Sequence, residues 1–139
     1  LDPINVKMFQ EAILELKEKG CSIIFSSHQM QHIELFCEKL VILVKGKVVL
    51  SGYLKDIKKE YRKKNIFIQG DISIDKLKKV PGVLDVTSTA KEYQVKIESE
   101  DVVDSVFQAI SKNKITKFVV EEASLNEIFI EKVGESYDK

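Results

Sequence analysis

The chain contains 139 residues, of which 44% are hydrophobic and 32% charged, and its 22 basic side chains balance its 22 acidic ones. This composition is typical of a folded globular chain and excludes a disordered one. No apolar stretch approaches the ~20 residues that a membrane-spanning helix requires, and no signal-peptide pattern opens the chain. Two cysteines, Cys21 and Cys37, are too few for a disulfide framework and favour a reducing compartment.

The first 20 residues predict one amphipathic helix. Asp2 is a suitable N-cap, Pro3 is tolerated in a first helical turn, and Gly20 is a typical helix end. Apolar side chains recur at intervals of three and four residues, which places them on one face of the helix. They are Val6, Phe9, Ala12, Ile13 and Leu16.

The next segment predicts a strand, a helix, a hairpin and a second helix. The apolar run at residues 23–25 predicts a strand over residues 21–26 that is buried on both faces, as in the middle of a parallel sheet. His28 follows this strand, at the carboxyl edge where α/β proteins bind ligands. The later elements are a helix with Met30, Ile33, Phe36 and Cys37 on one face, a hairpin of residues 40–44 and 47–50, and a helix with Leu54, Ile57 and Tyr61 on one face.

The second half predicts elements in the order β-α-β-β-α-β-α. Strands are predicted at residues 65–69, 84–88, 93–97 and 115–120, with a short helix at residues 74–78 and a turn at Pro81-Gly82. Two longer helices complete this half. One is capped by Glu100 or Asp101 and has Val103, Val106, Phe107 and Ile110 on its core face, and the other is capped by Ser124 and has Leu125, Ile128, Phe129 and Val133 on its apolar face.

The net charge of the chain changes sign between residues 64 and 65. Residues 1–64 carry 12 basic and 8 acidic side chains, whereas residues 65–139 carry 10 basic and 14 acidic ones. The pattern of elements restarts at the same place, so we predict two domains, 1–64 and 65–139. The fold class is therefore α/β plus α+β: a helix-strand-helix-hairpin unit, followed by a ferredoxin-like βαββαβ domain with an extra C-terminal helix.

Several motifs stand in a characteristic order in residues 1–57. Leu1-Asp2-Pro3 precedes the first helix, and Ser26-Ser27-His28-Gln29-Met30 follows the predicted strand. A Glu-x-x-Cys stretch at residues 34–40, a glycine-centred hairpin at residues 43–49 and Ser51-Gly52 come next. In these motifs the chain resembles the C-terminal part of an ABC transporter ATP-binding subunit, with Glu38-Lys39-Leu40 replacing the usual Asp-Arg-Val. Residues 122–129 resemble the end of the accessory domain of type-2 ABC exporters.

The resemblance implies roles for two residues. His28 would be the catalytic switch histidine, whose imidazole contacts the γ-phosphate of ATP and helps to orient the attacking water. Asp2 would belong to the D-loop, which crosses the dimer interface toward the nucleotide of the partner subunit. From position alone, His28 would instead be a satisfied, partly buried histidine and Asp2 an ordinary N-cap.

The resemblance also implies ATP and Mg²⁺ as cofactors of the full-length subunit. Its partners would be a second ATP-binding subunit and an integral membrane permease, through which it would lie at the cytoplasmic face of the cell membrane. The 139 residues contain neither a P-loop nor the Leu-Ser-Gly-Gly-Gln signature. We therefore expect a truncated nucleotide-binding domain that does not hydrolyse ATP alone, and whose uncovered strand edges form a non-native dimer through residues 1–50.

Other functions are open to parts of this sequence. The main alternative is a regulatory module that binds a small ligand, because ferredoxin-like folds often host small effectors. A zinc site of the two cysteines with His28 and His32 is not expected, because Cys21 lies a strand length away from His28.

Nucleic acid is not an expected partner. Phe67 and Tyr93 are too few aromatic side chains for a base-stacking sheet, and the second half is acidic. The basic run at residues 55–64 is better explained as the solvated face of a helix than as a site for lipid or nucleic acid. Phe129 and Ile130 leave two explanations open: a helix clasped between the domains, or an apolar contact between accessory domains of a transporter dimer.

Overall fold

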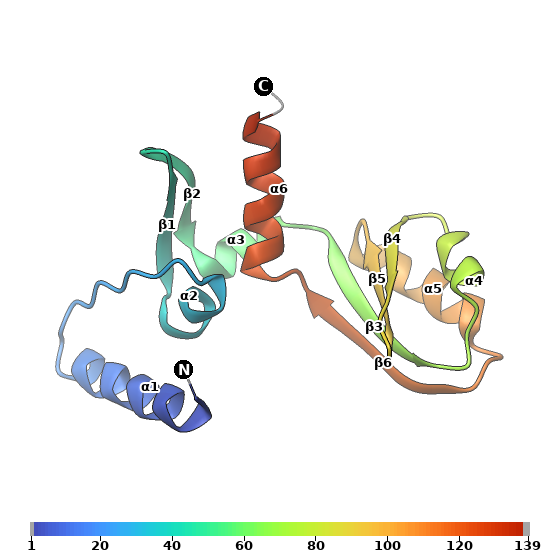
Figure 1. Ribbon diagram of the computed structural model, residues 1–139, viewed down its shortest axis with the longest axis horizontal. Coiled ribbons are helices and arrows are strands. Elements are labelled where there is room, and N and C mark those ends of the chain that lie inside the picture. Colours follow the sequence, from blue (N-terminus) through green and yellow to red (C-terminus); the bar gives the residue numbers. More distant parts are fainter. Residues whose placement is uncertain (1, 138–139) are drawn as a thin grey trace. The chain divides into compact units, whose positions relative to one another are not determined.

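The computed structural model describes residues 2–137, so Leu1 of the predicted D-loop lies outside the described residues. The chain forms two compact units: one comprises the residues up to Asp56 and from Phe129 onward, and the other comprises residues 57–128. The first contains a two-stranded and the second a four-stranded antiparallel sheet (Figure 1). The predicted mixture of α and β structure is thus confirmed. Within residues 2–137, no helix is long and apolar enough to cross a bilayer.

Helix α1 (Pro3–Glu18) forms where the apolar spacing predicts it. The Asp2 carboxylate caps its start by accepting a hydrogen bond from the backbone N–H of Asn5 at 2.9 Å. At the other end, Gly20 adopts a left-handed conformation with φ of 81°, and its N–H donates to the carbonyl of Lys17 at 2.9 Å. Both predicted helix ends are confirmed, because each supplies partners to backbone groups that the helix leaves unpaired.

The strand predicted at residues 21–26 does not form, and this prediction was wrong. These residues lead from α1 to α2 (Met30–Phe36) without strand pairing. A β-strand exists only where a neighbour exchanges ladder hydrogen bonds with it, and no segment of the described chain pairs with this one. Ile24 is consequently 98% exposed, although an apolar run of this kind predicts burial.

The predicted hairpin forms from β1 (Lys39–Val44) and β2 (Lys47–Tyr53). The two turn residues, Lys45 and Gly46, have φ angles of 51° and 77°. Positive φ at both central positions is typical of a type I′ turn, whose twist matches that of the paired strands. Helix α3 (Leu54–Glu60) follows with Ile57 buried, as predicted.

The second unit contains four strands: β3 (Lys64–Gly70), β4 (Val83–Ser88), β5 (Tyr93–Ile97) and β6 (Ile115–Glu122). Their order in the sheet is β4-β5-β3-β6, and every neighbouring pair is antiparallel. The connections carry the short helix α4 (Ile74–Lys78), the 3₁₀ turn η1 (Glu100–Val102) and helix α5 (Val103–Ile110). All four predicted strands are confirmed.

The core of this unit lies between one face of the sheet and helices α4 and α5 (Figure 1). Because side chains alternate along a strand, every second strand residue points into this core and the others point to the opposite face. Seven apolar core side chains are completely buried: Ile66, Ile68, Leu77, Val95, Ile97, Val106 and Ile110.

Two details around α5 correct the sequence predictions. Neither Glu100 nor Asp101 caps the helix, which starts through η1 after Ser99 without a side-chain cap. Phe107 is 43% exposed instead of lying in the core, and it packs edge-on against Phe118 of β6 at a centroid distance of 5.3 Å. Because β6 is the last strand of the sheet, no further strand of the described chain lies beyond it on this side.

The last helix, α6 (Leu125–Tyr137), starts as predicted. The hydroxyl of Ser124 accepts a hydrogen bond from the backbone N–H of Glu127 at 3.2 Å, and the Glu127 carboxylate accepts one from the Ser124 backbone N–H at 3.4 Å. This reciprocal pair is a capping box. Leu125 and Ile128 are buried, whereas Ile130 is 60% exposed.

Candidate functional site

His28 lies between the extended residues 21–27 and the first turn of α2, and its side chain is exposed. The hydroxyl of Ser27 accepts a hydrogen bond from the backbone N–H of Gln29 at 3.0 Å. A short side-chain hydrogen bond of this kind stabilises the turn that leads into the helix. The imidazole is therefore presented to solvent at the helix start and is not packed in the interior.

Three aromatic rings hold the segment that precedes His28. Phe25 packs against Phe9 of α1 at 5.8 Å and against Phe36 of α2 at 5.4 Å between ring centroids, and Phe9 and Phe36 lie 4.8 Å apart. Tilted and edge-on arrangements at these distances are favourable for aromatic pairs. His32, one helical turn after His28, contacts Phe36 at 6.1 Å and belongs to this cluster. The cluster fixes the chain on either side of His28 although the segment is not in a sheet.

The carboxylate of Asp2 is occupied within its own helix. One oxygen accepts the backbone hydrogen bond that caps α1, and the other accepts a hydrogen bond from the Asn5 side-chain amide at 3.0 Å. These partners do not include His28, so the structure does not bring the two predicted site residues together.

No three potential metal ligands gather anywhere in residues 2–137. Cys21 is exposed and Cys37 is half-buried, and both thiols are free. Burial raises the pKa of the Cys37 thiol, which favours its neutral form.

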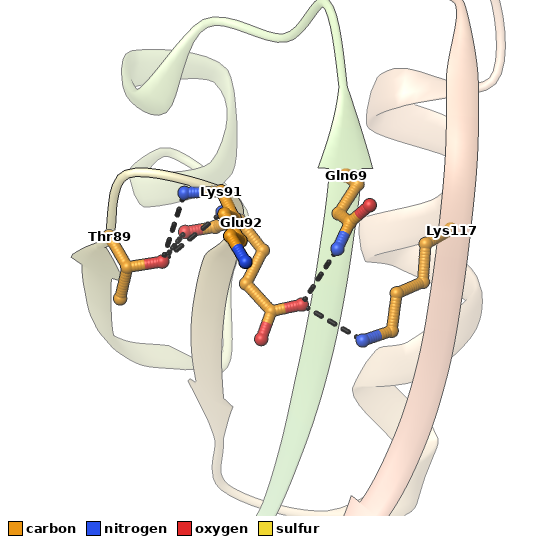
Figure 2. A network of polar contacts seen from close by, with 5 residues as sticks. All are labelled: Gln69, Thr89, Lys91, Glu92 and Lys117. Atoms are coloured by element: carbon orange, nitrogen blue, oxygen red, sulfur yellow. Dashed lines mark hydrogen bonds and ion pairs between the residues drawn. The ribbon is translucent and has the colours of Figure 1, made fainter.

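A polar network at one end of the four-stranded sheet was not expected from the sequence (Figure 2). The Glu92 carboxylate accepts an ion-paired hydrogen bond from Lys117 of β6 at 2.9 Å and a weaker one from Gln69 of β3 at 3.4 Å. The bond from Lys117 lowers the pKa of the Glu92 carboxyl. The Thr89 hydroxyl donates to the Glu92 carbonyl at 3.0 Å and accepts from the backbone N–H of Lys91, which closes the turn between β4 and β5.

The same residues line a shallow cavity of about 480 Å³. Within it, the carboxylate of Glu92 and the ammonium of Lys117 already neutralise each other. The Glu92–Lys117 ion pair links the β4–β5 turn to the edge strand β6 and stabilises the sheet. It gives no specific support to a ligand site.

A second polar contact links β3 to the start of α6. Asn65 is only 2% exposed, and its amide nitrogen donates to both carboxylate oxygens of Glu127 at 2.9 and 3.0 Å. The amide oxygen of Asn65 is buried without a hydrogen-bond partner among the described residues. Since 62 residues separate the two side chains, no local sequence pattern predicts this contact.

Comparison with known proteins identifies the second part of the chain. The family whose model matches residues 52–133 is described as "ATP-binding protein DrrA1-3-like, C-terminal domain". The match therefore covers more than half of the chain, including all four strands of the second unit.

Curated relatives match nearly the whole chain. The ABC transporter ATP-binding protein YhaQ of Bacillus subtilis is 45% identical over 139 residues, which are 99% of this chain and 47% of that protein. An ABC transporter ATP-binding protein of Alkalihalophilus pseudofirmus is 42% identical over 138 residues, which are 99% of this chain and 52% of that protein. The human glucosylceramide transporter ABCA12 is 28% identical over 145 residues, 94% of this chain but 6% of that protein. The chain thus spans about half the length of its two bacterial relatives.

Proposed function

The chain belongs to the family of DrrA1-3-like ATP-binding protein C-terminal domains, and on that premise we propose that it acts in the ATP-binding subunit of a type-2 ABC exporter. It corresponds to the C-terminal portion of ABC transporter ATP-binding proteins, as the relatives that match 99% of its length indicate. In this proposal a second ATP-binding subunit and a membrane permease are its partners, and the subunit works at the cytoplasmic side of the permease.

The observation that carries the proposal is the exposed imidazole of His28 at the start of α2, flanked by the motif residues. We assign His28 to the γ-phosphate of ATP, the nucleotide whose hydrolysis supplies the energy of transport. A neutral imidazole donates a hydrogen bond from one ring nitrogen and accepts one at the other, so it can contact a phosphate oxygen and orient a water molecule at once. The aromatic cluster of Phe9, Phe25 and Phe36 holds the chain on either side of His28 and so helps to position its imidazole.

Asp2 has a smaller part in the proposal. We assign it to the D-loop that faces the partner subunit, while its carboxylate continues to cap α1. Its capping bonds restrain the turn before α1, which is the segment that would approach the partner. We assign Mg²⁺ to the phosphates of the nucleotide, because this ion prefers oxygen ligands and commonly binds substrate phosphates.

We further propose that residues 1–64 belong to the nucleotide-binding domain and that residues 65–139 form a ferredoxin-like accessory domain. The sheet order β4-β5-β3-β6 with helices on one face supports this assignment, since it is the order of a split β-α-β fold. The compact second unit covers residues 57–128, so it begins slightly before this boundary, inside α3, and the residues from Phe129 onward group with the first unit. A regulatory module for a small ligand is not favoured, because the relatives are ATP-binding proteins and the Glu92–Lys117 pair is internally satisfied.

The test is a His28→Ala substitution in the full-length subunit that contains this chain. We expect the rate of ATP hydrolysis to fall by about a hundredfold or more, while the affinity for a fluorescent ATP analogue changes little. His32→Ala is the matched control, because His32 lies one turn further along α2 and packs on Phe36. Equal hydrolysis rates in the two variants would remove His28 from the site.

A further inference from the structure

Strand β6 forms one edge of the four-stranded sheet, and within residues 2–137 its one paired neighbour is β3. It is eight residues long, whereas the opposite edge strand, β4, has six residues and an irregular register near Val83. Proteins usually blunt edge strands by keeping them short, polar or bulged, because their free backbone groups accept another strand. The β3–β6 pairing also has an irregular register, near Gly70, but from Lys117 to Glu122 the register is regular, so β6 offers the longer edge for pairing.

Apolar side chains are exposed along the β6 edge on the side where α5 lies. Val120 is 38% and Phe107 of α5 is 43% exposed, and the Phe107 ring contacts that of Phe118, two residues before Val120 on the same face of β6. On the opposite face of the strand, Val119 is 37% exposed. Both faces of the edge therefore carry apolar surface that a neighbouring strand would cover.

The charges on β6 are complementary to those of a second, antiparallel copy of the same strand. Lys117 and Glu121 lie on the same face as Val119, two residues before and after it. If two copies pair around Val119, Lys117 of each stands opposite Glu121 of the other, and Phe118 stands opposite Val120. Opposite charges in facing positions stabilise strand pairs, and like charges destabilise them.

Among the residues of β6 itself, only this register places a basic side chain opposite an acidic one. A two-fold axis normal to the sheet keeps each side chain on its own face, so alternative registers differ by steps of two residues. One such step places Glu121 opposite Val119, and the step in the other direction places it opposite Ile115. Lys117 also bonds Glu92 within its own chain, but its ammonium carries three hydrogen-bond donors and can serve both carboxylates.

We propose that two copies of this chain associate through their β6 strands, which pair antiparallel around Val119 to form one continuous eight-stranded sheet. The interface is isologous, because the same strand is contributed by both copies. It does not depend on nucleotide or on His28, so its failure and the failure of the proposed function are separately observable.

Cysteine crosslinking tests the geometry directly. Val119→Cys is introduced in the Cys21→Ser/Cys37→Ser background, with Thr87→Cys on the opposite edge strand as the matched control. Facing Cα atoms in an antiparallel pair lie about 4.5–5.5 Å apart, which a disulfide can bridge. We expect mild oxidation to crosslink the Val119→Cys chain into dimers much faster than the control. Equal rates for the two variants would overturn the proposal.

A charge swap tests the register in the unmodified chain by sedimentation equilibrium. Glu121→Lys should weaken the dimer by about tenfold, because Lys117 then faces a lysine twice in each dimer. Adding Lys117→Glu together with Glu92→Lys also reverses the ion pair within each chain, so this triple variant should restore the wild-type dissociation constant. Circular dichroism melting of each variant establishes that the sheet is folded. A wild-type chain that stays monomeric, or a triple variant that associates no better than Glu121→Lys, would contradict the pairing.

Discussion

Replacing Asn65 with aspartate exchanges a hydrogen-bond donor for a second carboxylate directly against Glu127. In the wild-type chain the Asn65 amide donates to both oxygens of Glu127 at 2.9 and 3.0 Å, in a position where Asn65 is 2% exposed. The aspartate of Asn65→Asp has the same shape but offers only acceptors when it is ionised. At neutral pH two negative charges therefore meet in a partly buried position, where water screens them only in part.

The magnitude follows from two contributions. Loss of the hydrogen bonds to a charged group costs about 1.5–3 kcal/mol. Repulsion forces one of the two carboxyls to remain protonated, and each pKa unit by which it is raised costs a further ~1.4 kcal/mol near neutral pH. A total of roughly 3–5 kcal/mol is a large part of the stability of a small domain. We expect this loss in the free energy of unfolding of Asn65→Asp at pH near 7.

The sign of the pH dependence distinguishes repulsion from a simple loss of contacts. Because the folded-state pKa of the facing pair is raised above the unfolded value, the penalty is absent below about pH 4 and grows as the pH rises through the interval between the two values. Asn65→Ala loses the hydrogen bonds without adding charge, so its destabilisation should change little with pH.

Urea unfolding followed by circular dichroism at acidic and neutral pH measures these differences. Asn126→Asp is the matched control, because Asn126 is exposed in the first turn of α6, where a carboxylate is neutral or slightly stabilising. If Asn65→Asp is no less stable than Asn65→Ala at neutral pH, the facing arrangement of Asn65 and Glu127 is wrong.

Two further predictions concern the second unit. The ion-paired hydrogen bond from Lys117 lowers the pKa of Glu92 in the folded state. The stabilisation by this carboxylate is therefore present above its unfolded pKa and is lost as the pH falls through the lowered value. In urea unfolding at a series of pH values, the wild-type midpoint should fall in this acidic range, and the midpoint of Glu92→Gln should lack this fall. Gly82 has a φ of +92°, and a Cβ there would stand 2.4 Å from Cγ2 of Val102, so Gly82→Ala should lower the free energy of unfolding by about 1–3 kcal/mol. Gly134→Ala is the control and should not destabilise the chain, because a Cβ there meets nothing within 4 Å. Similar melting temperatures for the two variants would refute the close approach at Gly82.

Local signals in the sequence predict most of the elements of this fold. The caps at Asp2 and Ser124 and the Lys45-Gly46 turn are each specified by residues within four positions of one another. Alternation of apolar and polar residues locates β4 and β5 because one of their faces packs on the helices. These features need no knowledge of distant parts of the chain.

Features that depend on distant residues could not be predicted in the same way. From the sequence, Asn65 has the character of a surface residue in a strand. It is buried in the structure, where it contacts Glu127 at the start of α6. Glu92 lies just before β5 and Lys117 lies on β6, and they meet because β5 and β6 both flank β3. Phe107 has helical core spacing, but its position beside an edge strand leaves it partly exposed. The sequence contains the residues of these contacts without the topology that unites them.

The availability of a pairing partner explains both the missing strand at residues 21–26 and the proposed interface at β6. Residues 21–26 have a strong strand pattern, yet they form no strand, because within residues 2–137 no neighbour offers them a ladder. Strand β6 has one neighbour and therefore forms, but one of its edges remains free. An apolar strand pattern thus indicates that a segment can form a strand, and whether the strand forms depends on the presence of a neighbouring strand to pair with. The exposed Val119 and Val120, set between Lys117 and Glu121, make a second copy of β6 the partner that this edge best fits.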